Sequence, residues 1–434
     1  MHGHSIPRRH FGLMCPPVSG HLNPTFVLGR ELVRRGHRVS AVCLQELTPR
    51  VLAEGLDAVG IDGPEAPAGG LQAWAQELGR RNGLDAARFS VEGACRLIDL
   101  FCREAPGKIR DAGIDALLVD QNEPAGGSIA EHLGLPFVSV CTSLPLNRAA
   151  EVPPPFVSWG VGTAPWHGLR NWLGYRLTDV LIRPVQQRLN HWRQGWGLPL
   201  LRTPDDSFSK LAQVAQVVTE YEFPRSGWPP GFHGTGPFLD ARFNAQADFP
   251  WERLDPPGGR PLVYASLGTL QNQTLDTFRT IAEACASLPV QLVISLGGVP
   301  VPAEVAGGRE RWPGDPVIVS YAPQVALLER ATLMITHAGM NTVLHCLALG
   351  VPMVAVPITN DQPGIAARAK HCGAAAVLPL AQLSAPALRD RVQAVLREPS
   401  YRQAAQFIAQ AIERAGGVAR AADVIELAVS PGRA

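Results

Sequence analysis

The sequence lacks several features that mark other classes of protein. No uninterrupted apolar run reaches the ~18 residues that a membrane-spanning helix needs. The eight cysteines form no C-x-x-C pair, and we expect buried free thiols in a reducing compartment. The first residues contain no apolar signal core of sufficient length, so we expect a cytoplasmic protein. The formal net charge is only +1, which gives no general reason to expect a nucleic-acid partner.

Motifs for common cofactors are absent too. No G-x-G-x-x-G opens either half of the chain, and no G-x-x-x-x-G-K-[ST] occurs, so neither a dinucleotide enzyme nor a P-loop protein is indicated. There is no D-x-D pair and no cluster of His and Cys at zinc spacing. We therefore expect no cofactor and no catalytic metal.

What the sequence does contain is short apolar runs that alternate with longer helical patterns. Its 434 residues, 46% hydrophobic and 18% charged, indicate two globular domains of about 200 residues each. The first block begins with a strand, a helix and a strand, a βαβ unit that implies a parallel sheet. Its predicted strands are Phe11–Pro17, Val39–Leu44, Ala116–Val119 and Phe137–Cys141, with helices at Leu22–Arg35 and Ala125–Leu133.

A second block restarts the same alternation after a stretch rich in Gly, Pro and charge. Its predicted strands are Leu262–Leu267, Leu292–Leu296, Val317–Ser320, Met334–Thr336, Met353–Val356 and Ala375–Leu378, with helices at Leu275–Ala286 and Ala387–Leu396. We predict an α/β protein of two doubly wound, Rossmann-like domains that face each other across a cleft. The predicted parts are an N-terminal domain (1–235), a linker (236–260), a C-terminal domain (261–415) and a final helix (416–434) that packs back toward the N-terminal domain.

Two segments of the first block have more than one interpretation. Glu151–Leu177 collects Trp, Phe and Tyr among Pro and Gly, and forms either a packed surface layer or the wall of an apolar pocket. Arg183–Arg193 is basic with one aromatic, which is typical of a solvated helix face or, alternatively, of a segment that contacts a membrane surface.

Polar residues follow predicted strands of the second block, where an open α/β sheet binds ligands. Gly268 and Thr269 end one strand, and His337 follows another and opens a helix with Asn341 and Thr342 near its start. A helix N-terminus carries partial positive charge and free N–H groups, so this set suits a phosphate or diphosphate. The alternative is an ordinary helix cap.

Asp361 and Gln362 follow the next predicted strand. A carboxylate beside an amide can bind neighbouring sugar hydroxyls, or simply cap a turn. In the first block, His21 lies just after the first strand and Asp120 ends another. A carboxylate on the imidazole Nδ1 would make Nε2 a general base for a hydroxyl, whereas a lone His would be structural.

Three separated elements occur in a fixed order: Tyr321-Ala-Pro-Gln324, then His337-Ala-Gly-Met-Asn-Thr342, then Asp361-Gln362, which begins 24 residues after His337. Together with PPVSGHLNP and Asp120, they resemble the family 1 glycosyltransferases, which have the GT-B fold. The stretch from 336 to 369, especially DQPGIAAR, is most similar to bacterial carotenoid glucosyltransferases of the zeaxanthin type.

This resemblance implies a role for each matching residue. Tyr321 would stack on uracil, the Ala322 backbone would pair with its edge, and Gln324 would reach the ribose. The diphosphate would contact Thr269, His337, Asn341 and Thr342, and Gly268, Gly339 and Met340 would complete the donor site.

For the sugar and the chemistry, the resemblance implies that Asp361 and Gln362 bind glucose hydroxyls. His21 would deprotonate the acceptor and Asp120 would orient it. Two positions depart from the family pattern. Tyr321 replaces a frequent Trp, and His345 stands where a ribose-binding carboxylate is common. The second departure leaves open whether a uridine or a thymidine diphosphate sugar is preferred.

The function implied is an inverting, metal-independent transfer of glucose from UDP-glucose to a hydroxyl of a hydrophobic small molecule, a carotenoid such as zeaxanthin, by a monomeric enzyme. Trp74, Phe89, Phe156 and Trp159 would line the acceptor pocket. The alternatives are a flavonoid, macrolide or other natural-product glucosyltransferase, a nucleotide-sugar 2-epimerase, and a catalytically silent binding protein.

Overall fold

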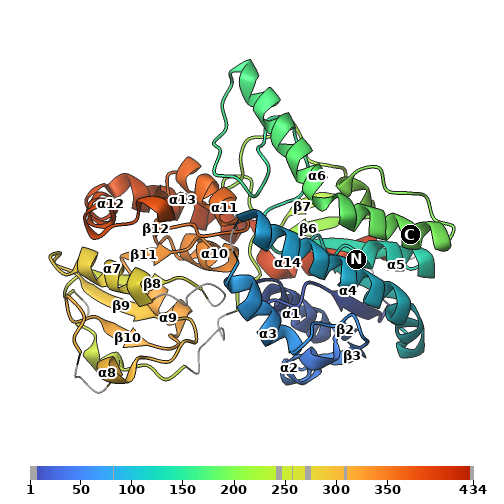
Figure 1. Ribbon diagram of the computed structural model, residues 1–434, viewed down its shortest axis with the longest axis horizontal. Helices are drawn as coiled ribbons and strands as arrows, with labels where there is room; N and C mark the ends of the chain where they lie inside the picture. Colours follow the sequence, from blue (N-terminus) through green and yellow to red (C-terminus); the bar gives the residue numbers. More distant parts are fainter. Residues whose placement is uncertain are drawn as a thin grey trace, which may run out of the picture.

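The structure, a computed structural model, describes residues 7–81, 83–240, 247–256, 258–268, 275–306 and 310–430. Within them the chain forms two parallel sheets, each covered by helices, that lie side by side (Figure 1). This is the predicted fold class of two doubly wound domains. Among the described residues, no helix combines the length and the hydrophobicity needed to span a bilayer.

The N-terminal sheet has seven parallel strands in the order β3-β2-β1-β4-β5-β6-β7. Successive residues of a central strand enter two different cores, since Phe11 and Leu13 pack on one face and Met14 on the other. The strands are β1 (His10–Met14), β2 (Arg38–Leu44), β3 (Asp57–Ile61), β4 (Ala116–Asp120), β5 (Phe137–Cys141), β6 (Gln213–Ala215) and β7 (Phe232–Gly234). The helices are α1 (Ser19–Arg34), α2 (Thr48–Ala53), α3 (Gly70–Gly79), α4 (Gly83–Ala112), α5 (Gly126–Leu133) and α6 (Pro165–Gly195).

The C-terminal sheet has six parallel strands in the order β10-β9-β8-β11-β12-β13. They are β8 (Leu262–Ser266), β9 (Gln291–Ser295), β10 (Val317–Val319), β11 (Leu333–Thr336), β12 (Met353–Ala355) and β13 (Ala375–Val377). The helices are α7 (Leu275–Cys285), α8 (Ala303–Ala306), α9 (Gln324–Leu328), α10 (Met340–Ala348), α11 (Gln362–His371), α12 (Ala385–Arg397), α13 (Pro399–Ala415) and α14 (Gly417–Ala428). In both sheets the strand order reverses beside the first strand, and a ligand site is expected there, outside the carboxyl ends of the strands.

The last helix, α14, leaves the C-terminal domain and packs on the N-terminal domain. Ala421 and Ile425 of α14 lie in the core beneath α1. Arg35 at the end of α1 pairs with Glu426 at 2.9 Å. The chain thus crosses between the domains twice, once through the linker and once into α14.

Buried polar contacts also join the two domains near α11. The Arg368 Nε donates to Glu222 Oε1 at 2.5 Å, and both side chains are almost fully buried. The Tyr221 hydroxyl donates to the Ile365 carbonyl at 3.1 Å. These contacts fix the loop after β6 against the helix that follows Asp361, and so help to set the relation between the two halves of the cleft.

The predicted strands are all present, with ends that differ by three residues or fewer. Three strands were not predicted, namely β3, which is only half-buried, and β6 and β7, which have three residues each. The aromatic segment Glu151–Leu177 is not a strand, as expected, but its second half belongs to α6, a helix of 31 residues.

Candidate active site

The candidate base is built at the switch point of the N-terminal sheet. His21 lies in the first turn of α1, and Asp120 ends the adjoining strand β4. The His21 Nδ1 lies 3.0 Å from Asp120 Oδ2 and 2.8 Å from Thr142 Oγ1. Thr142, just after β5, donates its own hydroxyl to the same carboxylate oxygen. Because Nδ1–H donates to Asp120, Nε2 is the basic nitrogen of this tautomer.

The electrostatics of this cluster favour a basic imidazole. Burial lowers the pKa of His21, but the charge and hydrogen bond of Asp120, with the charges of Asp361 and Glu123, outweigh it and raise the pKa overall. Asp120 itself is almost fully buried and also accepts from the Asn122 backbone N–H at 2.7 Å. The carboxylate is therefore held rigidly in the orientation that His21 requires.

An apolar cavity of about 180 Å³ opens beside the loop that leads to His21. Pro16, Pro17 and Val18 form one wall, and α3 and α4 form the others with Leu71, Trp74, Gly93, Ala94 and Leu97. Asn122 and Glu123 lie at its floor, next to Asp120. Burial raises the pKa of Glu123 to about 7, with Asp120 adding to the rise. The cavity suits an apolar molecule that carries a hydroxyl.

Across the cleft, the start of α10 is shaped around His337. Gly268, at φ +80°, and Gly339 both lie against the Nε2 and Cε1 atoms of the imidazole. A Cβ would come within 2.7 Å of the ring at Gly268 and within 2.5 Å at Gly339. Burial lowers the pKa of His337 to about 4, although a hydrogen bond with the Ser266 backbone acts to raise it. The ring is therefore neutral at physiological pH.

The first turn of α10 also touches the N-terminal domain. Met340 and Thr342 lie in this turn, and the Asn341 Nδ2 donates to the Gly20 carbonyl at 3.0 Å. Gly20 precedes His21, so this hydrogen bond couples the predicted phosphate-binding helix to the candidate base. The two sites predicted separately from the sequence are thereby brought together.

The predicted sugar-binding pair lies at the start of α11. The negative charge of Asp361 helps to raise the pKa of His21, and the charge of His21 helps to lower the pKa of Asp361. Burial raises the pKa of Asp361, with His21 opposing. The Gln362 Oε1 accepts from the backbone N–H groups of Ile358 and Thr359 at 2.9 and 3.0 Å, which fixes the amide.

The predicted nucleoside-binding residues lie around α9. Tyr321 is 46% exposed, as a stacking surface requires, and Ala322 is buried behind it. The Gln324 Nε2 donates to His345 Nδ1 at 3.0 Å. Burial lowers the pKa of His345 to about 4, with Asp240 opposing, so His345 is neutral and its Nε2 carries the hydrogen.

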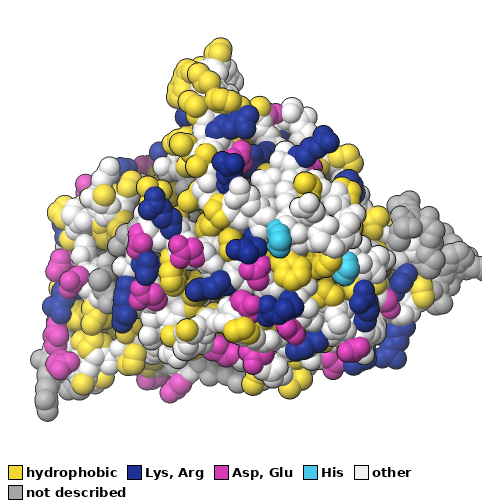
Figure 2. All heavy atoms as spheres, turned by 45° about the vertical axis from the view of Figure 1, so that its right-hand side comes forward, with side chains coloured by type: hydrophobic (Ala, Val, Ile, Leu, Met, Phe, Trp, Pro, Cys, Tyr) yellow, Lys and Arg dark blue, Asp and Glu magenta, His cyan; other side chains and the backbone are white. Residues whose placement is uncertain are grey.

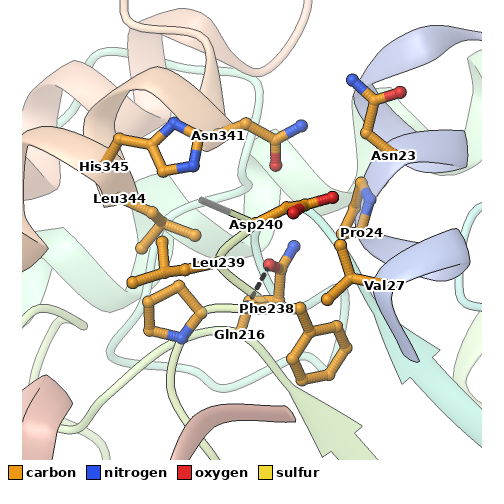
Figure 3. A pocket seen from close by; sticks show the side chains of 11 residues that line it. Asn23, Pro24, Val27, Gln216, Phe238, Leu239, Asp240, Asn341, Leu344 and His345 are labelled. Carbon is orange, nitrogen blue, oxygen red and sulfur yellow. Dashed lines mark hydrogen bonds between the residues drawn. The ribbon is translucent and has the colours of Figure 1, made fainter. Parts of the chain in front are cut away.

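His345 opens onto a small pocket between the two domains (Figure 3). Asn341, Leu344 and His345 line it from α10, and Asn23, Pro24 and Val27 line it from α1. Asp240 of the linker lies among them and also pairs with Arg30. The Asp240 carboxylate of the linker thus lies close to His345, the position at which the family pattern has a ribose-binding carboxylate.

Three of these residues had no sequence signal that marked them. Thr142 directly follows β5, and Glu123 lies three residues after the end of β4. Asp240 is in the linker, where charge is ordinary. Among the predicted acceptor residues, Trp74 lines the apolar cavity, and the Phe89 ring stacks on the Trp74 ring. Phe156 and Trp159 lie elsewhere, on the segment before α6. Thr269 lies outside the described residues.

Among the residues that the structure describes, no group of three or more His, Cys, Asp or Glu side chains could hold a metal ion.

Comparison with known proteins relates this site to a family. The sequence model for UDP-glucoronosyl and UDP-glucosyl transferase matches residues 216–411. A zeaxanthin glucosyltransferase of Pantoea ananas is 33% identical over 98% of this chain and 97% of its own. A second zeaxanthin glucosyltransferase, from Pseudescherichia vulneris, is 33% identical over 97% of this chain and 98% of its own. The 4'-demethylrebeccamycin synthase of Lentzea aerocolonigenes is 28% identical over 94% of this chain and 97% of its own.

Solved structures share the fold. The glycotransferase of kitacinnamycin aligns with a TM-score of 0.74 at 23% identity, over 98% of this chain and all of its own. The calicheamicin glycosyltransferase CalG4 aligns with a TM-score of 0.74 at 22% identity, over 98% of both chains.

Proposed function

The chain belongs to the UDP-glucoronosyl and UDP-glucosyl transferase family, and we propose that it transfers glucose from UDP-glucose to a hydroxyl of an apolar acceptor of the zeaxanthin type, with inversion at the anomeric carbon. One observation carries this proposal. His21, with its Nδ1 held by a buried carboxylate, follows the Pro16–Val18 loop that lines the apolar cavity, and the charge of Asp361 from the other domain helps to raise its pKa. The names of the two relatives that are 33% identical support the acceptor class.

The proposed reaction is a single displacement. The His21 Nε2 takes the proton of the acceptor hydroxyl while the acceptor oxygen attacks the anomeric carbon. The bond from that carbon to the diphosphate oxygen breaks, and UDP leaves with the electron pair. Asp120 stabilises the imidazolium that forms, and the proton then passes to solvent. General-base assistance of this kind contributes about 10²- to 10⁴-fold to the rate.

The leaving group would be stabilised by the protein itself. The N-terminus of α10 supplies backbone N–H groups and a positive dipole end, and the neutral His337 supplies a further hydrogen-bond donor. We therefore propose that transfer needs no divalent cation, and that it continues in excess EDTA.

The donor preference depends on the ribose contacts. In the proposed complex, Gln324 and His345 meet the ribose, and the linker carboxylate of Asp240 stands in for the absent one. A uridine donor, with its 2′-hydroxyl, would use these groups more fully than a thymidine donor would. This is the reason for proposing UDP-glucose rather than dTDP-glucose.

The test is a donor-by-acceptor matrix read by mass spectrometry. UDP-glucose and dTDP-glucose are each incubated with zeaxanthin, a flavonoid alcohol and a macrolide alcohol. The proposal predicts a zeaxanthin glucoside formed most rapidly with UDP-glucose. A flavonoid or macrolide glucoside as the best product would overturn the acceptor, and isomerised donor without any glucoside would indicate an epimerase. Intact donor in every arm would indicate a silent binding protein.

A further inference from the structure

The most unusual surface of the molecule is a projection that stands away from both domains. We define the projection as residues 156–180, which comprise the end of a loop and the first half of α6. It rises above the two domains, with the start of α6 outermost (Figure 1). Seven of the 18 exposed large apolar side chains of the described residues lie in it, namely Phe156, Trp166, Leu169, Trp172, Leu173, Leu177 and Val180.

The first half of α6 exposes its apolar side chains to solvent instead of burying them. Trp166, Leu169, Leu173, Leu177 and Val180 follow one another at steps of three or four residues, so they form one stripe along α6. Each is between 49% and 73% exposed. An amphipathic helix of a globular protein buries such a stripe in its own core. Here the stripe faces outward, as Figure 2 shows for the hydrophobic side chains gathered at the tip of the projection.

The inner face of the projection is held by polar and small residues instead. The Asn171 Nδ2 donates to the Ala150 carbonyl at 3.0 Å, and the Tyr175 hydroxyl donates to the Val152 carbonyl at 3.1 Å. Gly174 allows Trp159 and Pro154 to pack against the helix. The side chains that hold the projection to the loop before it are thus different from those of the exposed stripe.

The outer part of the projection carries positive charge only, and Asp179, near the end of the projection, pairs with Arg148. No Asp or Glu lies between Glu151 and Asp179, and the arginines in that interval are Arg170 and Arg176. The Arg170 guanidinium lies over the rings of Trp159 and Trp166 at 5.0 and 5.3 Å, and Arg176 lies 5.4 Å from the Trp172 ring. Tryptophan rings with nearby arginines are typical of a protein surface that lies at the boundary between lipid headgroups and acyl chains.

We propose that the projection is a membrane-docking element that inserts its apolar tip into a bilayer surface containing anionic lipids. A bilayer explains the three observations together, because the acyl region takes the Leu and Trp side chains and the anionic headgroups take Arg170 and Arg176. A second copy of the chain explains them less well, since a twofold contact between projections would bring the like charges of the two copies together.

Docking in this way would also place the site near the bilayer. Pro155, at the base of the projection, lies against Gly364 of α11, next to the Asp361-Gln362 pair. The mouth of the cleft would then lie close to the membrane, where an apolar acceptor is dissolved. This consequence rests on the proposed function, whereas docking itself does not.

Co-sedimentation with vesicles tests the proposal, without donor or acceptor present. The full chain is mixed with phosphatidylcholine vesicles with and without 30% phosphatidylglycerol. The test variant changes three stripe residues, Leu169→Gln, Leu173→Gln and Leu177→Gln. The matched control changes three equally exposed apolar residues elsewhere, Leu84→Gln, Phe407→Gln and Leu427→Gln.

We expect the wild type to sediment with the anionic vesicles, the test variant to bind at least tenfold more weakly, and the control to bind as the wild type does. The Arg176→Gln variant should bind more weakly and lose part of the salt dependence. Absence of wild-type binding, or equal binding of both triple variants, would overturn the proposal. The proposal would also be overturned if light scattering showed that the wild type and the control variant are dimers and that the test variant is a monomer. Retained glucosyl transfer by the test variant on a detergent-solubilised acceptor shows that it is folded, and a failure of vesicle binding would leave the proposed transfer reaction untouched.

Discussion

At the residue scale, the proposed chemistry rests on one imidazole and the groups that fix its tautomer. His21 Nδ1 is held by Asp120, and Asp120 is held in turn by Thr142 and the Asn122 backbone. Each of these donors favours the charged carboxylate, and the charged carboxylate favours a basic imidazole. The sequence predicted the pair but not the third side chain, because a threonine one residue past a strand looks like any other threonine.

The pH dependence of turnover should report this arrangement. The base acts when His21 is neutral, and its pKa is raised above the ordinary value, so kcat/KM should rise with pH through a midpoint above that of a free histidine. Asp120→Asn removes the charge that opposes burial, so the midpoint should move to lower pH while the plateau rate falls.

Glu123 is the control for this profile, since its pKa of about 7 lies in the same range. A Glu123→Gln variant should keep the rising limb. If Glu123→Gln abolishes the limb and Asp120→Asn leaves it in place, the limb belongs to Glu123 and the assignment to His21 is wrong.

The anomalous residue of the donor site is His345, which is neutral and accepts from Gln324. His345→Glu would restore the carboxylate that the family pattern leads one to expect. We expect a lower KM for UDP-glucose, by roughly three- to tenfold, with little change for dTDP-glucose, because one charge-assisted hydrogen bond to the ribose 2′-hydroxyl is worth about 1 kcal/mol or more. Equal changes in KM for both donors would show that His345 does not face the ribose.

At the scale of elements, strand ends and helix starts were the parts of the site that the sequence predicted best. The strand before His337 and the helix after it formed as expected, because a run of buried residues and a run of helical period are both visible in sequence. The apolar cavity was predicted only in part. Its walls come from α3 and α4 together with the loop after β1, and the approach of these elements depends on packing between residues distant in the chain.

Tight packing at the start of α10 gives a second test of an element. Gly339, the residue that caps the start of α10, has an extended backbone with φ −66° and ψ 137° that any residue can adopt, so a substitution there is limited by space rather than by backbone strain. In Gly339→Ala the new Cβ would meet His337 Nε2 at 2.5 Å and displace the ring. We expect KM for the donor to rise at least tenfold, with a loss of stability of about 1–3 kcal/mol.

The control is Gly107→Ala on α4, where a Cβ meets nothing within 4 Å. It should leave KM unchanged and add about 0.5–1 kcal/mol of stability through helix propensity. Equal effects of the two substitutions on KM would contradict a role for the space around His337.

At the scale of the whole molecule, the cleft depends on contacts that cross between the domains. Two domains joined by a linker could be predicted from the alternation of strands and helices, but the contacts that orient them could not. The Glu222–Arg368 pair joins residues 146 positions apart, and an isolated Glu or Arg in the sequence is usually a surface residue.

Removal of one partner of this pair should be costly. Glu222→Ala would leave the buried Arg368 without its carboxylate, and we expect a loss of about 3–5 kcal/mol and a lower melting temperature in calorimetry. Replacement of both residues by Leu should recover most of the loss. Glu220→Ala breaks an exposed pair with Arg414 and should change stability by no more than about 0.5 kcal/mol. If Glu220→Ala and Glu222→Ala are equally mild, the buried pair does not hold the domains together.

The central claim is that a base at His21 drives an inverting glucosyl transfer to an apolar hydroxyl. The most direct measurement is the reaction of UDP-glucose with zeaxanthin, with the rate followed by mass spectrometry and the anomeric configuration of the product read by NMR, for the wild type and for His21→Ala. We predict a β-glucoside from the α-linked donor and a rate at least 10²-fold lower in the variant, with the dissociation constant of UDP-glucose changed less than threefold. An α-glucoside, or a variant that transfers at nearly the wild-type rate, would contradict the account.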